Sequence, residues 1–161
     1  MKKNNIDNVF QFVRLNNLNE FKKTVDRDNV NLYINEYNQN LLHEAISNNS
    51  LDIIDYLFKI NININYQDEE GKTPLHYAVL YKNIYTINLL LSNKLINKNI
   101  SDIYGNNSMW IAVFNARGEY DIVKLLKKYD VDYLSKNNNG MSPLDFAKNI
   151  EDIELINILL N

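Results

Sequence analysis

Apolar residues recur along the chain in pairs of short segments that are separated by polar stretches. In three places a small Ala, at Ala45, Ala78 or Ala147, is followed by mostly apolar side chains at a spacing that places them on one face of a second helix. After Ala112 the second segment comes slightly later, which indicates an insertion at 116–119. The pattern predicts helix pairs at 6–29, 40–60, 73–93, 107–129 and 142–160.

A turn motif precedes the first helix of the third pair. The stretch 68–78 reads D-x-x-G-x-T-P-L-H-x-A, in which Gly71 is free to adopt the positive φ of a turn. Thr73 is a suitable N-cap, and Pro74 then stands at the first helical position, where its missing N–H costs nothing. The motif therefore predicts a tight turn that leads directly into a helix.

The same motif returns in register along the chain. Parts of it stand one period earlier at His43, one period later at Gly105, and a further period later at Gly140. Trp110 takes the His place of the fourth copy, where we expect it to pack in the core. The motif and its spacing resemble the ankyrin repeat, a unit of about 33 residues that consists of a β-turn and two helices. The linker 61–68 also resembles the family's G-A-D-V-N-x-x-D, with Asn in place of Gly and Asp.

The resemblance implies an all-α fold, namely an ankyrin-repeat solenoid of about five helix-turn-helix repeats with β-turn or hairpin fingers. The fingers are expected near 35–40, 68–73, 102–107 and 137–142. One domain covers 1–161, and we place its repeats at 1–34, 35–67, 68–101, 102–136 and 137–161.

The two end repeats differ from the others. In the first, Phe10 and Val13 take the inward positions of the first helix, and Asp7 is expected to cap that helix. Because the end repeats of a solenoid expose one flank to water, we expect both to act as polar caps and the protein to be a monomer. The polar residues that we assign to the last cap are Glu151, Asp152 and Glu154.

The composition narrows the classes of partner. Of the 161 residues, 45% are hydrophobic and 23% are charged, which is typical of a globular domain. The net charge of −3 leaves no basic stripe for phosphates, so we expect no nucleic-acid partner. The chain has no Cys, and no apolar run approaches the roughly 18 residues of a membrane span, so we expect no membrane partner. We expect a cytoplasmic location, or one inside a host cell, since small proteins of the resembled family are frequent in viruses and host-associated bacteria.

No residue pattern indicates catalysis. His43 and His76 both fall at the motif position, where we expect each imidazole to bond main-chain groups of the neighbouring turn; a shared metal site is the weaker alternative. Asp68, Glu69 and Glu70 suggest an acid/base pair or a calcium loop, but no D-x-[DN]-x-[DN]-G pattern follows. Neither G-x-S-x-G nor a Gly-rich phosphate loop is present. We therefore expect a protein that is not an enzyme and that takes no cofactor or metal.

The resemblance implies that contacts with a partner come just after the turn Asp, just after the turn Gly and at the end of the first helix. In this frame the middle repeats present apolar and aromatic side chains beside an acidic edge of Glu36, Glu69 and Glu70. Such a surface favours a partner with an apolar centre and a basic rim. For Phe114, beside the insertion, an inward orientation is the alternative. The predicted contact residues are Tyr37, Glu69, Glu70, Lys72, Leu80, Tyr81, Ile103, Tyr104, Asn106 and Phe114.

Two functional hypotheses follow from the sequence. The first is a non-catalytic module that binds a partner protein through the concave groove formed by the finger tips and first helices. The alternative is a structural ankyrin segment, or a subunit of a larger protein or complex, whose activity resides elsewhere. Binding of one protein through the predicted contact residues would distinguish the first hypothesis from the second.

Overall fold

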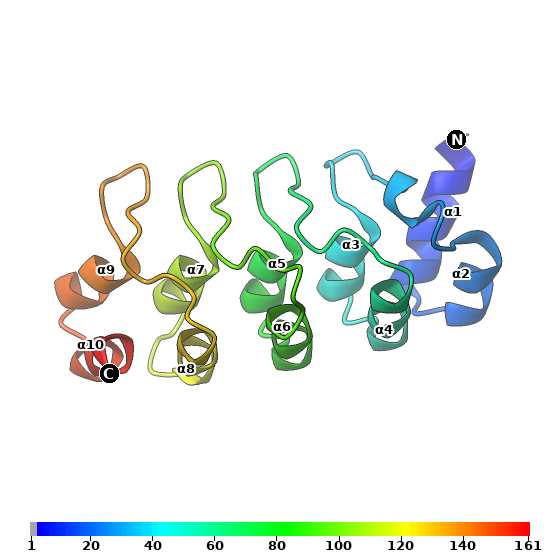
Figure 1. The fold of residues 1–161 in the computed structure, drawn as a ribbon. Helices are drawn as coiled ribbons and strands as arrows, with labels where there is room; N and C mark the ends of the chain where they lie inside the picture. The colour runs from blue at the N-terminus through cyan, green and yellow to red at the C-terminus, as the bar shows by residue number, and fades with distance from the viewer. Residues whose placement is uncertain (1–2) are drawn as a thin grey trace.

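The helices of the chain form two parallel rows along an elongated array (Figure 1). The computed structural model describes residues 3–161, so the first two residues of the first predicted repeat lie outside the described residues. The first helices of the five pairs are α1 (Lys3–Arg14), α3 (Leu41–Ser47), α5 (Pro74–Leu80), α7 (Ser108–Phe114) and α9 (Pro143–Asn149). The second helices are α2 (Leu18–Thr24), α4 (Leu51–Lys59), α6 (Ile84–Leu91), α8 (Asp121–Lys128) and α10 (Ile153–Leu160). A short 3₁₀-helix, η1 (Val30–Leu32), follows the first pair.

Each helix pair packs mainly on its sequence neighbours. The first helices contact one another in the order α1, α3, α5, α7 and α9, and each also packs on the second helix of its own pair. The two ends of the chain lie at opposite ends of the array (Figure 1). This arrangement is an all-α repeat solenoid, as the resemblance of the repeated motif implies.

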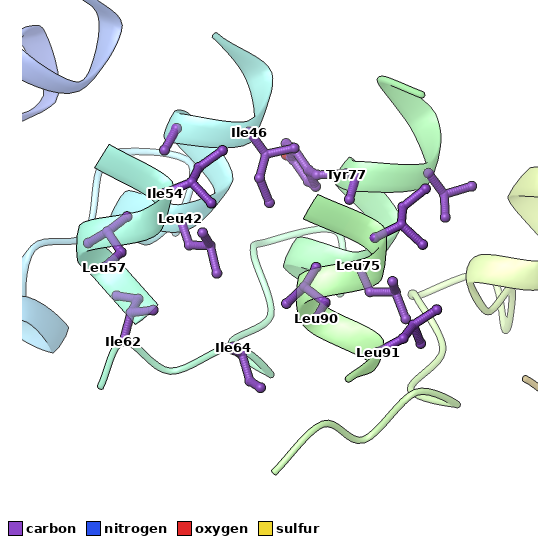
Figure 2. Close-up of a cluster of buried hydrophobic side chains, with 14 of the residues drawn as sticks. Leu42, Ile46, Ile54, Leu57, Ile62, Ile64, Leu75, Tyr77, Leu90 and Leu91 are labelled. Carbon is purple, nitrogen blue, oxygen red and sulfur yellow. The ribbon is translucent and has the colours of Figure 1, made fainter. Parts of the chain in front are cut away.

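Apolar side chains fill the space between successive helix pairs. Leu42, Ile54, Leu75 and Leu90 belong to one cluster of buried side chains in the second and third pairs, and all four are at most 1% exposed (Figure 2). Because the inward face of one pair is covered by the next, no pair could bury its apolar surface alone. The core therefore runs along the whole array and has no single centre.

The motif histidines connect neighbouring repeats, as predicted. His76 Nδ1 accepts a hydrogen bond from the main-chain N–H of Thr73 at 3.1 Å, and its Nε2 donates to the carbonyl of Asn106 in the next finger at 3.1 Å. His43 does the same with the N–H of Asn40 and the carbonyl of Lys72. Both imidazoles are buried, and burial lowers the pKa of each, that of His43 to about 4. Each ring is therefore a neutral Nε2–H tautomer that bonds one turn to the next.

The four fingers share one hydrogen-bond pattern. In each, an Asp or Asn side chain accepts two main-chain N–H groups, from the residues two and four positions later. Gly71 has φ +74°, as the turn motif predicts, and Gly105 and Gly140 also have positive φ. Main-chain bonds then join each finger to the next: Glu69 N–H to Tyr37 C=O, Ile103 N–H to Glu70 C=O, and Asn138 N–H to Tyr104 C=O.

Two local predictions about the helices have different outcomes. The insertion in the fourth repeat is confirmed, because residues 115–120 separate α7 from α8 while only 81–83 separate α5 from α6. Arg117 and Gly118 take up the extra length with positive φ values of 44° and 87°. The capping role of Asp7 is wrong: α1 begins at Lys3, so Asp7 lies in its second turn.

Candidate functional site

A hollow of about 330 Å³ lies between the fingers and first helices of the third and fourth repeats. Its wall combines side chains from both fingers with the exposed sides of α5 and α7. The residues that line it are Lys72, Leu80, Asp102, Tyr104, Asn106, Trp110, Ile111, Phe114 and Asn115. We call this hollow the central groove.

Two aromatic rings of α7 line the central groove. The rings of Trp110 and Phe114, one helical turn apart on α7, each have their centroid 5.5 Å from that of Phe146 on α9. Phe114 is 56% exposed, so the outward orientation is confirmed. Phe146 of the next repeat thus lies beside both rings, and both rings also line the central groove.

The prediction that Trp110 packs in the core is wrong. Its side chain is only partly buried and lines the central groove. The indole is larger than the imidazole it replaces, and it packs against Phe146, whereas the two histidines bond the carbonyl of the next finger. The sequence signal for its place in the groove was that Trp110 stands where the motif has His.

A charged pair lies at one side of the central groove. Lys72 Nζ donates to the carboxylate of Glu70. Partial burial opposes ionisation of Lys72, but the hydrogen bond to Glu70 and the charges of Glu70, Asp68 and Asp102 raise its pKa. Lys72 is therefore a cation whose charge is already engaged by a carboxylate.

The predicted contact residues do not form one cluster. Five of them line the central groove: Lys72, Leu80, Tyr104, Asn106 and Phe114. Tyr37 lines a separate hollow of about 380 Å³ beside α1, and Tyr81 lines another of about 470 Å³ near the starts of α4 and α6. Glu69, Glu70 and Ile103 lie outside the central groove.

Three residues that line the central groove were missed by the sequence prediction: Asp102, Trp110 and Ile111. The contact frame of the resembled family does not include these positions. Asp102 was assigned only as a turn residue, and Ile111 as part of a helix. Their spatial proximity follows from the way that the finger folds over α7.

Within residues 3–161 no group of three or more His, Cys, Asp or Glu side chains is arranged to hold a metal ion. The same residues contain no helix of the length and apolar character needed to cross a bilayer.

A buried hydroxyl completes the hydrogen bonding of the third finger. Tyr77 OH donates to Asp68 Oδ2 at 2.7 Å and accepts from Gln39 Nε2 at 2.6 Å. Burial, and the hydrogen bond to Asp68, raise the pKa of this hydroxyl. Tyr77 thus anchors the third finger to α5.

We expect Tyr77→Phe to lower the free energy of unfolding by about 1–2 kcal/mol, because it leaves Asp68 Oδ2 without its donor in a buried place. Urea unfolding would measure this. The matched control is Tyr104→Phe, since Tyr104 is 56% exposed and its change should stay within about 0.5 kcal/mol. Equal effects of the two changes would show that the Tyr77 hydroxyl does not anchor the finger.

Comparisons with known proteins agree with the repeat architecture of the fold. The family model for ankyrin repeats (3 copies) matches residues 2–102 and 61–137. Ankyrin repeat protein FPV031 of Fowlpox virus (strain NVSL) is 26% identical over 159 residues, covering 75% of this chain and 47% of that protein. Ankyrin repeat protein L371 of Acanthamoeba polyphaga mimivirus is 32% identical over 111 residues, covering 68% of this chain and 14% of that protein.

A third similar protein is a channel subunit. The Transient receptor potential cation channel subfamily A member 1 of Homo sapiens is 30% identical over 115 residues, covering 68% of this chain and 10% of that protein. The chain thus spans about half, or much less, of the length of the curated relatives it matches.

Proposed function

Since the chain belongs to the ankyrin repeat family, we propose that it is a non-catalytic module that binds a partner protein through the central groove and the finger tips beside it. Repeats of this family are generally protein-interaction modules. Fold alone does not assign a function, so the proposal depends on the character of this surface.

One observation carries the proposal. Leu80, Tyr104 and Phe114 are each about half exposed, at 47%, 56% and 56%, and they surround the same hollow. A purely solvated surface of these helices and fingers would carry polar side chains at these places. Exposed aromatic and aliphatic groups that meet at a concave site, with amides and charges at its edge, are typical of the centre of a protein interface.

A second candidate function has its own support. The relatives compared above are about twice as long as this chain or longer, judged from the covered shares of 47%, 14% and 10%. This favours a structural ankyrin segment, or a subunit of a larger protein or complex, whose activity resides elsewhere. The cytoplasmic or host-cell location stays a prediction for either candidate, as does the monomeric state.

We expect Leu80→Ala, Tyr104→Ala and Phe114→Ala, combined in one variant, to weaken binding of a captured partner roughly tenfold or more, because these side chains would form the centre of the contact. Affinity capture from a lysate would identify candidates, and titration of each purified candidate would give its dissociation constant. The matched control combines Tyr85→Ala with Leu95→Ala, which are 50% and 79% exposed and do not line the central groove.

The outcomes separate the two functions. Binding that is lost in the groove variant but kept in the control supports the binding module. Binding that survives both changes places the contact elsewhere on the chain. A chain that retains no protein favours the structural segment. Circular dichroism of all three proteins would ensure that each result comes from a folded solenoid.

A further inference from the structure

The four fingers begin with the same kind of side chain, which allows an internal comparison. Asn35, Asp68, Asp102 and Asn137 each use Oδ1 to accept the two main-chain N–H groups of the turn. The remaining polar atom of the side chain, Nδ2 or Oδ2, takes no part in these two bonds and can bond another group. This outer atom is where the fingers differ.

Three of the four outer atoms have a partner within the chain. Asn35 Nδ2 donates to Gln39 Oε1 at 2.9 Å, and Asn137 Nδ2 donates to Asn106 Oδ1 at 2.9 Å. Asp68 Oδ2 accepts from Tyr77 OH. Among the described residues, no donor reaches Asp102 Oδ2, and both bonds of this carboxylate go to Oδ1.

The cause of this gap is a single position in α7. Ile111 takes the place in the fourth repeat that Tyr77 has in the third, in the same register that aligns Asp102 with Asp68. An isoleucine has no hydroxyl, so the fourth finger lacks the donor that the third finger has. Asp102 is only 9% exposed, and both it and Ile111 line the central groove.

The charges around Asp102 favour a cation from outside. The cation that lines the groove is Lys72, which forms its ion pair with Glu70 and not with Asp102. Glu70, Asp68 and Asp102 all act on the charge of Lys72, so three acids and one base leave a net negative charge at this place. A mostly buried carboxylate that keeps one oxygen unpaired is a strong acceptor for a charged donor.

We propose that the central groove receives an arginine side chain of the partner protein. Its guanidinium donates to Asp102 Oδ2, and its flat face and aliphatic stem lie on the rings of Trp110 and Phe114. Arginine fits both features, because it donates in a fixed fork and stacks on aromatic rings. The inference rests on the proposed function, and it adds the residue type that the partner supplies.

Asp102→Asn is a sharp test because the chain itself holds Asn at this place in two other fingers, Asn35 and Asn137. The Oδ1 bonds of the turn are kept, while the outer oxygen becomes an N–H₂ donor that repels a cation. The charge-matched control is Glu119→Gln, which also removes one acid but lies on an exposed segment outside the central groove.

The probes are random linear peptides that are displayed on phage and selected on the wild-type chain. Each selected peptide is then synthesised in two forms, one with arginine and one with its neutral isostere citrulline at the same position. Trp110 is the single tryptophan of the chain and lines the groove, so its fluorescence reports binding. We expect Asp102→Asn and the citrulline exchange each to weaken binding roughly tenfold, and the two together to weaken it little more than either alone.

Four other outcomes overturn the inference in different ways. Peptides that bind the groove but tolerate citrulline or Asp102→Asn would show that no arginine contacts Asp102, while the proposed function stands. The same follows if tyrosine or another neutral donor is enriched in place of arginine. Peptides that bind equally to the Leu80, Tyr104 and Phe114 variant, or a selection that enriches nothing, would count against the proposed function as well.

Discussion

Lowering the pH from 7 to about 4.5 is expected to reduce the free energy of unfolding by about 3 kcal/mol, mainly through His43. Burial lowers the pKa of His43 from its ordinary value of 6.5 to about 4, so the folded chain keeps this imidazole neutral. The unfolded chain takes up a proton as the pH falls below 6.5. Stability is therefore lost progressively between pH 6.5 and about 4, at about 1.4 kcal/mol per pH unit for one proton. His76, whose pKa burial also lowers, adds to the same loss.

Urea unfolding at several pH values would measure this dependence. Hydrogen bonds with Ser142 lower the pKa of Asp145, so its contribution is complete above its ordinary value of 3.8 and is lost only below it. Measurements that stay above about pH 4.5 therefore separate the histidines from this carboxylate. The comparison variant is His43→Gln, which should be less stable at pH 7 but should lose less stability on acidification. Identical pH slopes for the two proteins would exclude His43 as the source.

Gly105→Ala should lower the free energy of unfolding by about 3 kcal/mol, which is more than a strained backbone alone accounts for. Gly105 has φ +81°, and an added Cβ would lie 2.8 Å from Asn138 Oδ1 and 2.9 Å from Asn138 N. The same N–H donates to the carbonyl of Tyr104 and joins the fourth finger to the fifth. The substitution would therefore force neighbouring fingers apart in addition to straining one turn.

The chain contains a matched control for this effect. Gly140 has φ +72°, but an added Cβ there meets nothing within 4 Å. Gly140→Ala should thus cost only the left-handed backbone, about 1 kcal/mol. Thermal and urea unfolding of both variants would give the difference, which isolates the contact between fingers. Equal losses in the two variants would mean that the fingers adjust freely to each other.

The fold could be predicted from the sequence because a solenoid depends on local signals. Turn glycines, cap residues and the Ala spacing each act within one repeat, and the repeat then stacks on its neighbours. The roles of His43 and His76 followed from their place in the motif and are confirmed by their bonds to the next turn. The helix start at Lys3 was missed because the first repeat lacks the motif that marks the other starts.

The site could be predicted only in part. The positions that the family resemblance assigns to partner contacts include Leu80, Tyr104 and Phe114, and these three side chains line the same groove. Tyr81 follows Leu80 in sequence, yet it caps the end of α5 and lies in a different hollow. One residue beyond a helix end, the direction of a side chain depends on the turn that follows, and spacing does not fix it. The roles of Asp102 and Ile111 could be recognised only by comparing, repeat by repeat, the first residue of each finger with the residue at one fixed position of the following helix.

The main-chain bonds between fingers couple each repeat to the adjacent ones. A disturbance at one end therefore fades along the array as it passes through successive links, as in a one-dimensional lattice with nearest-neighbour coupling. A ligand held between the third and fourth fingers would stiffen the links on both sides of it first. The solenoid therefore behaves like a short elastic rod, and a ligand bound at its middle would stabilise the repeats on both sides to a similar extent.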